Sequence, residues 1–127
     1  MAKYKKKLDA DIRCPLEYGL TIFGGKSGKA LMNSQTVLTV WDDARLVGLI
    51  RVLDDSEMLA QIHYVLVHPE YQGQGIAGRM VEYIKEKYKN FMYLELMPED
   101  KNNVPFYEKH GFHVMENGAA MQICNIN

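Results

Sequence analysis

Three apolar runs follow one another in the middle of the chain, at 37–41, 46–53 and 59–67. Each is rich in valine, leucine, isoleucine or aromatic residues, and short polar stretches that begin with aspartate pairs separate them. The third run stops before Pro69, which has no backbone N–H to donate to a sheet. Runs of this composition joined by short turns predict three strands of an antiparallel meander.

The apolar period then changes from that of a strand to that of a helix. Ile76, Met80, Ile84 and Tyr88 recur every four residues, while charged side chains occupy the opposite side. This spacing predicts an amphipathic helix with one buried face. A further run of β-forming residues at 92–96 predicts a fourth strand after the helix.

The N-terminal part of the chain carries a weaker helical pattern. Leu16, Leu20 and Phe23 recur at helical spacing, which predicts two short helices between Pro15 and Ser34 with a break at Gly24-Gly25. The residues before Pro15 include a run of lysines, and they are expected to form an extension outside the predicted elements.

Past the fourth strand the pattern predicts a short helix. Asn103 is its expected cap, Pro105 falls in its first turn and Gly111 lies just past its end. The runs at 112–115 and 121–126 flank an Asn-Gly pair and predict a closing hairpin. The order of elements is then αα-βββ-α-β-α-ββ, which indicates a mixed α+β fold.

Length and charge narrow the classes of function. The 127 residues, 47% of them apolar, suit a single domain over 1–127. With 15 basic and 16 acidic residues, the net charge of −1 draws the molecule neither to nucleic acid nor to an anionic membrane. Two cysteines cannot form a disulfide framework or a thiolate zinc cluster, and no histidine spacing indicates another metal. No apolar stretch suits a signal peptide or membrane span, so a cytoplasmic protein is expected.

The glycines between the third strand and the long helix carry the strongest chemical signal. Gly73, Gly75 and Gly78 let the backbone approach a ligand closely, and the start of the helix leaves N–H groups unpaired. The positive end of the helix dipole adds to their attraction for an anion, so the segment predicts a phosphate site. The alternative is that these glycines serve only the turn.

Taken alone, Gly73-x-Gly75-x-x-Gly78 also matches the GxGxxG fingerprint of dinucleotide-binding proteins. Glu95 even lies near the position of the acid that binds a ribose hydroxyl in such proteins. Three observations weaken this NAD-binding alternative. Residues 68–72 separate the strand from the first glycine, the strands upstream are predicted to be antiparallel, and little chain remains after Glu95 for further parallel strands.

Two motifs resemble those of the GCN-five-related N-acetyltransferase (GNAT) superfamily. The segment Gln72-Gly73-Gln74-Gly75-Ile76-Ala77 fits the family signature Q/R-x-x-G-x-G/A, and Val67–Tyr71 before it is typical of the same family. A second motif, Phe106–Phe112, follows in the expected order. The resemblance covers Thr36–Ile126 and implies the acyl-CoA N-acyltransferase fold, a mixed, mostly antiparallel sheet flanked by helices.

The resemblance implies that the chain binds acetyl-CoA. In the family, the amides of this loop hold the pyrophosphate of coenzyme A, and the strand before the loop pairs with the pantetheine arm. Many members also have an asparagine before the second motif that contacts the cofactor. Carried over to this sequence, the expected cofactor-binding residues are Leu66, Val67, Gln72, Gly73, Gln74, Gly75, Ile76, Ala77, Gly78 and Asn103.

Acetyl transfer from a thioester to an amine needs a neutral amine, stabilisation of the oxyanion and a proton for the departing thiolate. The resemblance assigns the proton to Tyr107, for which packing against neighbouring phenylalanines is the alternative, and the oxyanion contact to a backbone amide near Leu66. Some family members have a glutamate where this chain has Gln61, and an amide cannot take up a proton. His63 is the candidate base; its alternatives are a structural imidazole, or an amine that enters already neutral.

The resemblance therefore implies an enzyme that transfers an acetyl group from acetyl-CoA to a primary amine of a small molecule or peptide. No metal, nucleic-acid or membrane partner is expected, and a homodimer is compatible with the family. An acyl-CoA-binding module without activity stays open because Gln61 replaces an acid, as does a NAD-binding protein. The segment Cys14–Lys26 looks like the opening of small winged-helix regulators, but the meander leaves no recognition helix.

Overall fold

The computed structural model describes residues 25–125 of the 127-residue chain. They belong to two compact units, one that ends at Leu96 and one that begins at Met97. The first unit holds a sheet with its helices, and the second holds a short helix and the C-terminal segment. The first of the two predicted N-terminal helices lies outside the described residues, as does residue 126 of the predicted hairpin.

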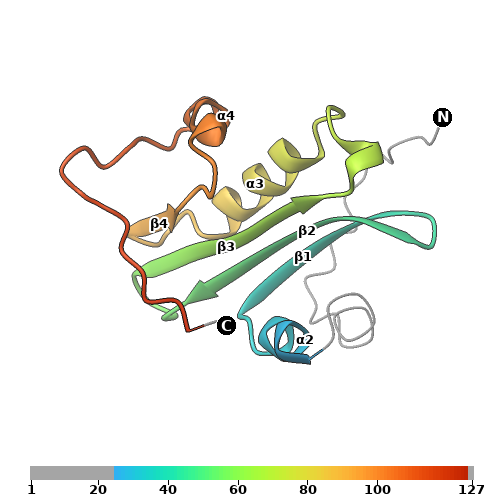
Figure 1. Ribbon diagram of the computed structural model, residues 1–127, viewed down its shortest axis with the longest axis horizontal. Helices are drawn as coiled ribbons and strands as arrows, with labels where there is room; N and C mark the ends of the chain where they lie inside the picture. The colour runs from blue at the N-terminus through green and yellow to red at the C-terminus, as the bar shows by residue number, and fades with distance from the viewer. Residues whose placement is uncertain (1–24, 126–127) are drawn as a thin grey trace. The chain divides into compact units, whose positions relative to one another are not determined.

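A four-stranded sheet forms the centre of the first unit (Figure 1). Strands β1 (Thr36–Asp42), β2 (Arg45–Asp54) and β3 (Leu59–Val67) are antiparallel neighbours joined by short turns. Strand β4 (Tyr93–Leu96) is parallel to β3, so the order across the sheet is β1-β2-β3-β4. The predicted meander, the fourth strand and the mixed, mostly antiparallel sheet are confirmed.

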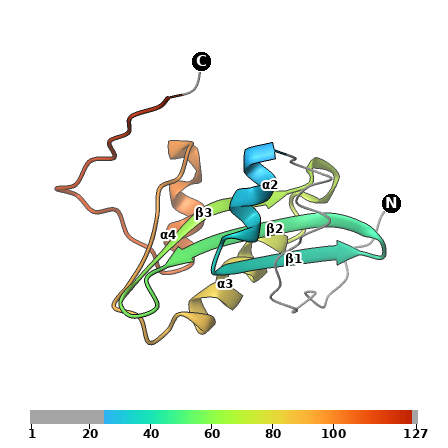
Figure 2. The ribbon, with the colours of Figure 1, turned by 90° about the horizontal axis from the view of Figure 1, so that it is seen from below.

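Helices α2 (Gly25–Met32) and α3 (Ile76–Lys87) cover opposite faces of this sheet (Figure 1 and Figure 2). Leu31 of α2 packs in a buried cluster with Leu49 of β2. The preceding residue, Gly48, lies against α3 instead, because successive residues of a strand point to opposite faces. Helix α2 confirms the second of the predicted N-terminal helices.

Helix α3 packs on the sheet as its four-residue period predicts. Ile76, Met80 and Ile84 are at most 1% exposed, and Tyr88 follows the last turn as the C-terminal cap residue. A Cβ atom at Gly48 would stand 3.0 Å from Ile76 Cγ2 and 3.3 Å from Met80 Sδ. The missing side chain at Gly48 therefore lets the helix approach the sheet closely.

A bulge interrupts the pairing of β2 with β3. Arg51 lies opposite Tyr64, whereas the next residue, Val52, lies opposite Ile62. His63 is therefore the additional residue of β3 at this point. A bulge re-aims the side chains around it, and here the rings of His63 and Tyr64 lie with centroids 4.5 Å apart.

Strand β4 covers only the first part of β3. The parallel pairing joins Leu59–Ile62 to Tyr93–Leu96, and β3 continues to Val67. Within the described part of the chain, no strand pairs with the β4-facing edge of β3 from His63 onward. The two parallel strands therefore part at the bulge and leave a strand edge open.

The second unit contains the predicted short helix, which a 3₁₀ turn precedes. The 3₁₀ turn η2 (Lys101–Asn103) leads directly into α4 (Val104–Lys109). The side chain of Asp100 accepts a hydrogen bond from a backbone amide of η2 at 2.9 Å, whereas Asn103 has helical dihedral angles and makes no capping hydrogen bond. Asn103 therefore occupies the predicted cap position of α4, but its side chain does not cap the helix, because η2 precedes it and Asp100 caps that turn instead.

The predicted C-terminal hairpin is wrong for the residues that are described. Residues 112–125 contain no strand, although a turn brings the Gly118 amide to Met115 O at 3.1 Å. Met121 and Ile123 are 92% and 88% exposed. A two-stranded ribbon is marginally stable unless one face is buried, and these side chains stay in solvent.

Candidate functional site

The loop between β3 and α3 is open in front of its glycines. Gly73 and Gly75 have φ angles of +83° and +84°, in the left-handed region that strains any residue with a side chain. A Cβ atom built at either position meets no other atom within 4 Å. These glycines are therefore required by the backbone conformation, and the space in front of them is open.

The N-terminal end of α3 presents unpaired amides to this space. The first hydrogen bond within the helix joins the Arg79 amide to Gly75 O at 3.1 Å, so the amides of Ile76, Ala77 and Gly78 precede it. Gly75 occupies the cap position and has no side chain to accept from them, and the first turn contains no acidic residue. Such a helix end attracts an anion through its N–H groups and its dipole.

Hydrogen bonds within the loop hold its backbone in place. His68 Nδ1 accepts from the Glu70 amide at 3.1 Å, and the His68 amide donates to Val47 O on β2 at 2.8 Å. The side chain of Gln72 turns back, and its Nε2 donates to Val67 O at 3.2 Å. Gln72 therefore braces the loop with its side chain and can offer a ligand its backbone amide.

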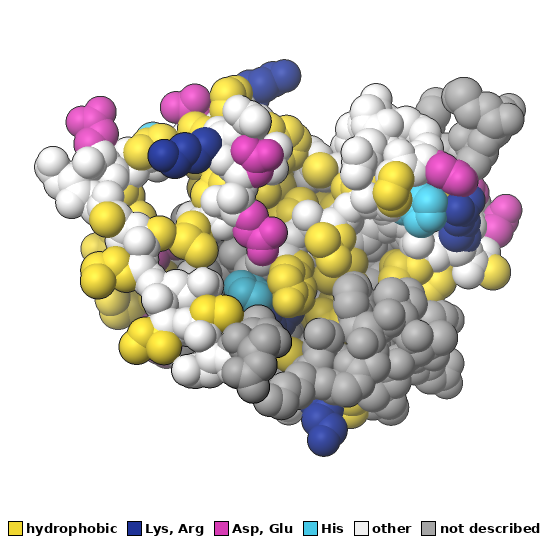
Figure 3. Space-filling model, in the orientation of Figure 1, with side chains coloured by type: hydrophobic (Ala, Val, Ile, Leu, Met, Phe, Trp, Pro, Cys, Tyr) yellow, Lys and Arg dark blue, Asp and Glu magenta, His cyan; other side chains and the backbone are white. Residues whose placement is uncertain are grey.

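The turn between β1 and β2 supports the same loop from outside. Tyr71 is 1% exposed and donates its hydroxyl hydrogen to Asp42, which raises the pKa of the tyrosine. Arg45 lies with its guanidinium 5.4 Å from the Tyr71 ring centre and pairs with Glu70 at 3.1 Å. Charged side chains of both signs and a histidine gather beside each other at the right of Figure 3. The loop between β3 and α3 is thus fastened to the sheet at its start and left open at its glycines.

The open edge of β3 begins directly at this loop. Since the His68 amide donates to Val47 on β2, and alternate residues of a strand direct their N–H and C=O groups to the same side, Leu66 also faces β2. Val65 and Val67 then direct their backbone groups to the opposite, open edge. Of the two residues with an expected backbone contact, Val67 therefore faces the open edge and Leu66 faces β2.

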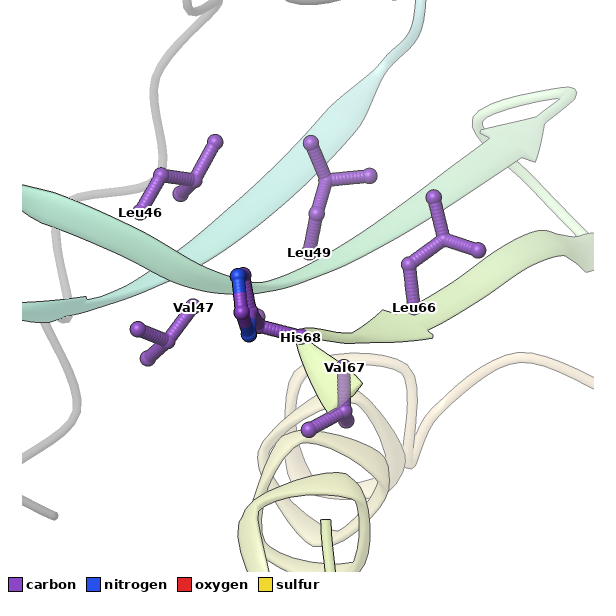
Figure 4. Close-up of a pocket in the computed structure, with 7 residues that line it drawn as sticks. Leu46, Val47, Leu49, Leu66, Val67 and His68 are labelled. Carbon is purple, nitrogen blue, oxygen red and sulfur yellow. The ribbon is translucent and has the colours of Figure 1, made fainter. Parts of the chain in front are cut away.

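An apolar hollow of about 180 Å³ lies over the neighbouring ends of β2 and β3 (Figure 4). The side chains of Leu46, Leu49 and Leu66 point to one side of the strands, and those of Val47 and Val67 point to the other (Figure 4). Leu66 is 40% exposed there. Leu66 therefore exposes its side chain on this face, while its backbone groups face β2.

His63, the candidate base, has its acceptor nitrogen in use. Arg51 Nη1 lies 2.5 Å from His63 Nδ1, and Arg51 Nε donates to Ser34 Oγ at 2.7 Å. Because a guanidinium can only donate, Nδ1 must accept and the ring proton must lie on Nε2. In this arrangement neither ring nitrogen is available to take a proton from an amine. Sequence reasoning missed Arg51 and Ser34; a charged residue inside a continuous apolar strand was the available signal.

Tyr107 and Asn103 lie in the second unit, apart in sequence from the loop. The Tyr107 ring packs against Phe106 and Phe112, with centroids 5.0 and 5.9 Å away. Burial raises the pKa of Tyr107, so its hydroxyl keeps its proton at neutral pH. Asn103 is exposed at the junction of η2 and α4.

Within residues 25–125, no group of three histidine, cysteine or acidic side chains is arranged to hold a metal ion. None of the helices described there is both long and apolar enough to cross a membrane.

Comparison with known proteins assigns this arrangement to a family. Residues 11–112 match the model of the Acetyltransferase (GNAT) family. An uncharacterised, ycf52-like N-acetyltransferase of Prochlorococcus marinus is 30% identical over 95 residues, which are 71% of this chain and 53% of that protein. The chain thus spans about half the length of that curated relative, 53%.

Solved structures share the fold. A probable acetyltransferase of unknown function from meticillin-resistant Staphylococcus aureus has a TM-score of 0.73 and 28% identity, covering 93% of this chain and 98% of that one. A GNAT family acetyltransferase from Elizabethkingia anophelis with acetyl-CoA bound has a TM-score of 0.62 and 20% identity, covering 80% of this chain and 71% of that one.

This chain belongs to the GNAT acetyltransferase family. The family match and the antiparallel strands before the glycine loop overturn the dinucleotide-binding alternative, because a dinucleotide fold begins with parallel strands.

Proposed function

We propose that this chain is an N-acetyltransferase that uses acetyl-CoA as donor and a primary amine as acceptor. The proposal depends above all on the junction of β3 and α3. There the open start of a helix adjoins a strand edge without a partner among the described residues. Membership of the family supports the same activity.

The segment Gln72–Gly78 is proposed to hold the pyrophosphate of the donor. The amides of Ile76, Ala77 and Gly78 lie ahead of the first helical hydrogen bond, and no side chain stands in front of the glycines. Since the net charge of the chain is only −1, attraction for this anion must come from local N–H groups and the helix dipole.

The open edge of β3 is proposed to take the pantetheine arm as an additional strand. Val65 directs its N–H and C=O groups to that edge and Val67 its N–H group, where the amide groups of an extended ligand can pair with them; Val67 O already accepts from Gln72 Nε2. Acetyl-CoA, when bound, supplies an acetyl group activated as a thioester. A backbone amide of β3 at this edge, that of Val65, is suited to stabilise a developing oxyanion.

Tyr107 is proposed to hold the proton for the departing sulfur on its Oη atom. Its raised pKa keeps that proton in place through the neutral range. His63 is a poor base while Arg51 occupies its acceptor nitrogen. We therefore favour an amine that enters already neutral over proton transfer to His63.

A binding module without activity is the second candidate. Its basis is Gln61, an exposed amide on β3 opposite Glu95, at a position where some family members have a glutamate. Such a module would bind acetyl-CoA and release no thiol when amines are added.

Thermal unfolding with acetyl-CoA or with NADH tests the donor. A ligand at 100 times its Kd stabilises the folded state by about 2.7 kcal/mol. Stabilisation by acetyl-CoA and none by NADH is expected. Stabilisation by NADH alone would overturn the proposal.

Thiol release from acetyl-CoA, followed over a panel of amines, distinguishes the enzyme from the binding module. Tyr107→Phe keeps the ring packing with Phe106 and Phe112 and removes only the hydroxyl. Turnover should fall much more than affinity for acetyl-CoA. Unchanged turnover would remove Tyr107 from the mechanism.

A further inference from the structure

Arg51 is a charged side chain buried in the middle of an apolar strand. Its neighbours on β2, Ile50 and Val52, are fully buried, and Arg51 itself is only 9% exposed. Burying a guanidinium removes most of its hydration, and such charges are normally paired with an anion. The partners of Arg51 therefore decide whether its burial is compensated.

Among residues 25–125, the hydrogen-bonding partners of Arg51 include no carboxylate. Its Nε donates to Ser34 Oγ, its Nη1 lies 2.5 Å from His63 Nδ1, and its guanidinium carbon lies 5.7 Å from the ring centre of Tyr64. Within residues 25–125, no carboxylate forms an ion pair with it. Arg45, which is exposed, pairs with Glu70. Among the described residues, the exposed arginine therefore has a carboxylate partner and the buried Arg51 has none.

Donor capacity is left over on the guanidinium. A guanidinium has five N–H groups, and the contacts to Ser34 and His63 engage Nε and one N–H of Nη1. The second N–H of Nη1 and both of Nη2 remain. Two parallel N–H groups of this kind match the two oxygens of a carboxylate or a phosphate.

The position of Arg51 relates it to the proposed reaction. It lies opposite Tyr64, and it contacts His63, the first residue of β3 beyond the pairing with β4. Arg51 therefore lies near the His63 end of the open β3 edge, and the glycine loop follows the other end. Tyr64 packs on the cluster of Leu31 and Leu49, so the site is on the α2 face of the sheet.

We propose that Arg51 binds an oxyanion, a carboxylate or a phosphate, carried by the amine acceptor. This inference rests on the proposed acetyltransferase function and adds the class of acceptor to it. The anion would supply the missing counter-charge, and the guanidinium would hold the acceptor by a group that does not react. The acceptor amine would then be fixed relative to the point where β3 and β4 part.

Matched pairs of acceptors test the proposal. One pair is an amino acid and its carboxamide, and the other is an aminoalkyl phosphate and the corresponding amino alcohol. Thiol release gives kcat/KM, and calorimetry with and without coenzyme A gives the Kd of each acceptor. The wild-type protein should prefer the anionic member of at least one pair by roughly 10-fold or more in both measurements. The pair with the larger preference identifies the oxyanion.

Variants separate binding from a structural role. For each acceptor pair, the preference is the ratio of kcat/KM for the anionic member to kcat/KM for the neutral member. Arg51→Gln should lower this ratio by roughly 10- to 100-fold, and Arg51→Lys should keep part of the preference. Ser34→Ala is the matched control, because it removes a hydrogen bond to Nε and leaves the charge in place. Its ratio should stay within about twofold of wild type.

The results that overturn the inference are specific. A wild-type protein that binds neutral and anionic acceptors equally would reject it, even if Arg51→Gln fails to fold. So would an Arg51→Gln protein that loses activity on both members of a pair in equal proportion. A wild-type protein that does not bind acetyl-CoA but still prefers the anionic acceptor by calorimetry would instead reject the proposed function. The binding of an oxyanion by Arg51 would then still stand.

Discussion

The N-terminal tip of α3 is open, whereas the rest of that helix is closely packed. The body of the helix is in close contact with the sheet, so that a Cβ atom at Gly48 would stand 3.0 Å from Ile76. At the other end of the helix, Tyr88 Oη is tied by hydrogen bonds to Asp54 and Thr36. The tip has a glycine at its cap position and no atom within 4 Å of a Cβ built there.

The difference separates two uses of glycine. The φ angle of Gly48 does not lie in the left-handed region, and this residue lacks a side chain because a helix occupies the space. Gly75 has a positive φ and lacks a side chain because the backbone requires it, while the space stays open. Residue type alone therefore cannot distinguish a packing position from a binding position, but substitution can.

Gly48→Val should have the largest effect, and on stability. The first atom of the new side chain would meet Ile76 at 3.0 Å and Val40 at 3.2 Å, in a core that cannot expand without cost. We expect the free energy of unfolding to fall by about 3 kcal/mol, measured by urea denaturation. Gly118→Ala is the control, since its Cβ would meet Met115 at an ordinary 3.6 Å. Equal loss in both variants would contradict the packing argument.

Gly75→Glu should act on the ligand more than on the fold. Bulk and negative charge at the helix tip oppose a phosphate, so affinity for acetyl-CoA should fall at least about 30-fold, or ~2 kcal/mol. Strain at a positive φ should lower stability by about 1–2 kcal/mol. Gly75→Ala shares the strain without the charge, and calorimetry on both variants isolates the charge. Unchanged affinity in the glutamate variant would rule out the tip as the phosphate site.

Tyr88→Phe tests the closed end of the helix. It leaves the Asp54 carboxylate and the Thr36 hydroxyl without their shared partner, which should lower the free energy of unfolding by about 1–2 kcal/mol at neutral pH. Affinity for acetyl-CoA should not change. An affinity loss as large as that of Gly75→Glu would mean that the two ends of α3 are not independent.

The same tyrosine gives a pH dependence with a definite sign. Burial, followed by the hydrogen bond to Asp54, raises the pKa of Tyr88 to about 12, against about 10 in an unfolded chain. The folded state holds the proton more tightly, so this stabilisation is complete below about pH 10 and is lost as the pH rises toward 12. The difference in unfolding free energy between wild type and Tyr88→Phe should therefore shrink over that window. A constant difference would contradict the raised pKa.

Arg45→Gln should have the smallest effect. The Arg45–Glu70 pair is exposed to solvent, where ion pairs contribute little because water and salt screen them. We expect no measurable change in stability and less than about a twofold change in acetyl-CoA affinity. A large loss of affinity would show that the contacts of Arg45 with Glu70 and Tyr71 set the shape of the N-terminal tip of α3.

The sheet and α3 could be predicted because their signals are local and repeated. The strand predicted at 59–67 is β3, residue for residue, since Pro69 ends it chemically. The helical period of Ile76, Met80 and Ile84 was equally direct, because each of these side chains is buried against the sheet. In such segments burial and backbone preference agree.

The failures have a common origin in partners that a sequence does not display. An Asn-Gly pair between two apolar runs predicted a hairpin from residue 112, but a ribbon needs a surface to cover it. The role of Asn103 depended on where η2 begins, and the backbone direction of Leu66 depended on the register with β2. The role inferred for Arg51 depends on its contacts with Ser34 and His63, which the sequence does not display.

Pro98 gives the short β4 a further meaning. If β4 continued past Leu96 in the same register, residue 98 would come to lie beside Tyr64, and a proline there has no N–H to contribute to the ladder. The proline therefore prevents β4 from extending its pairing along the open edge of β3. The β3 edge beyond His63 therefore stays available for the donor that we propose, and the proline is what keeps β4 from covering it.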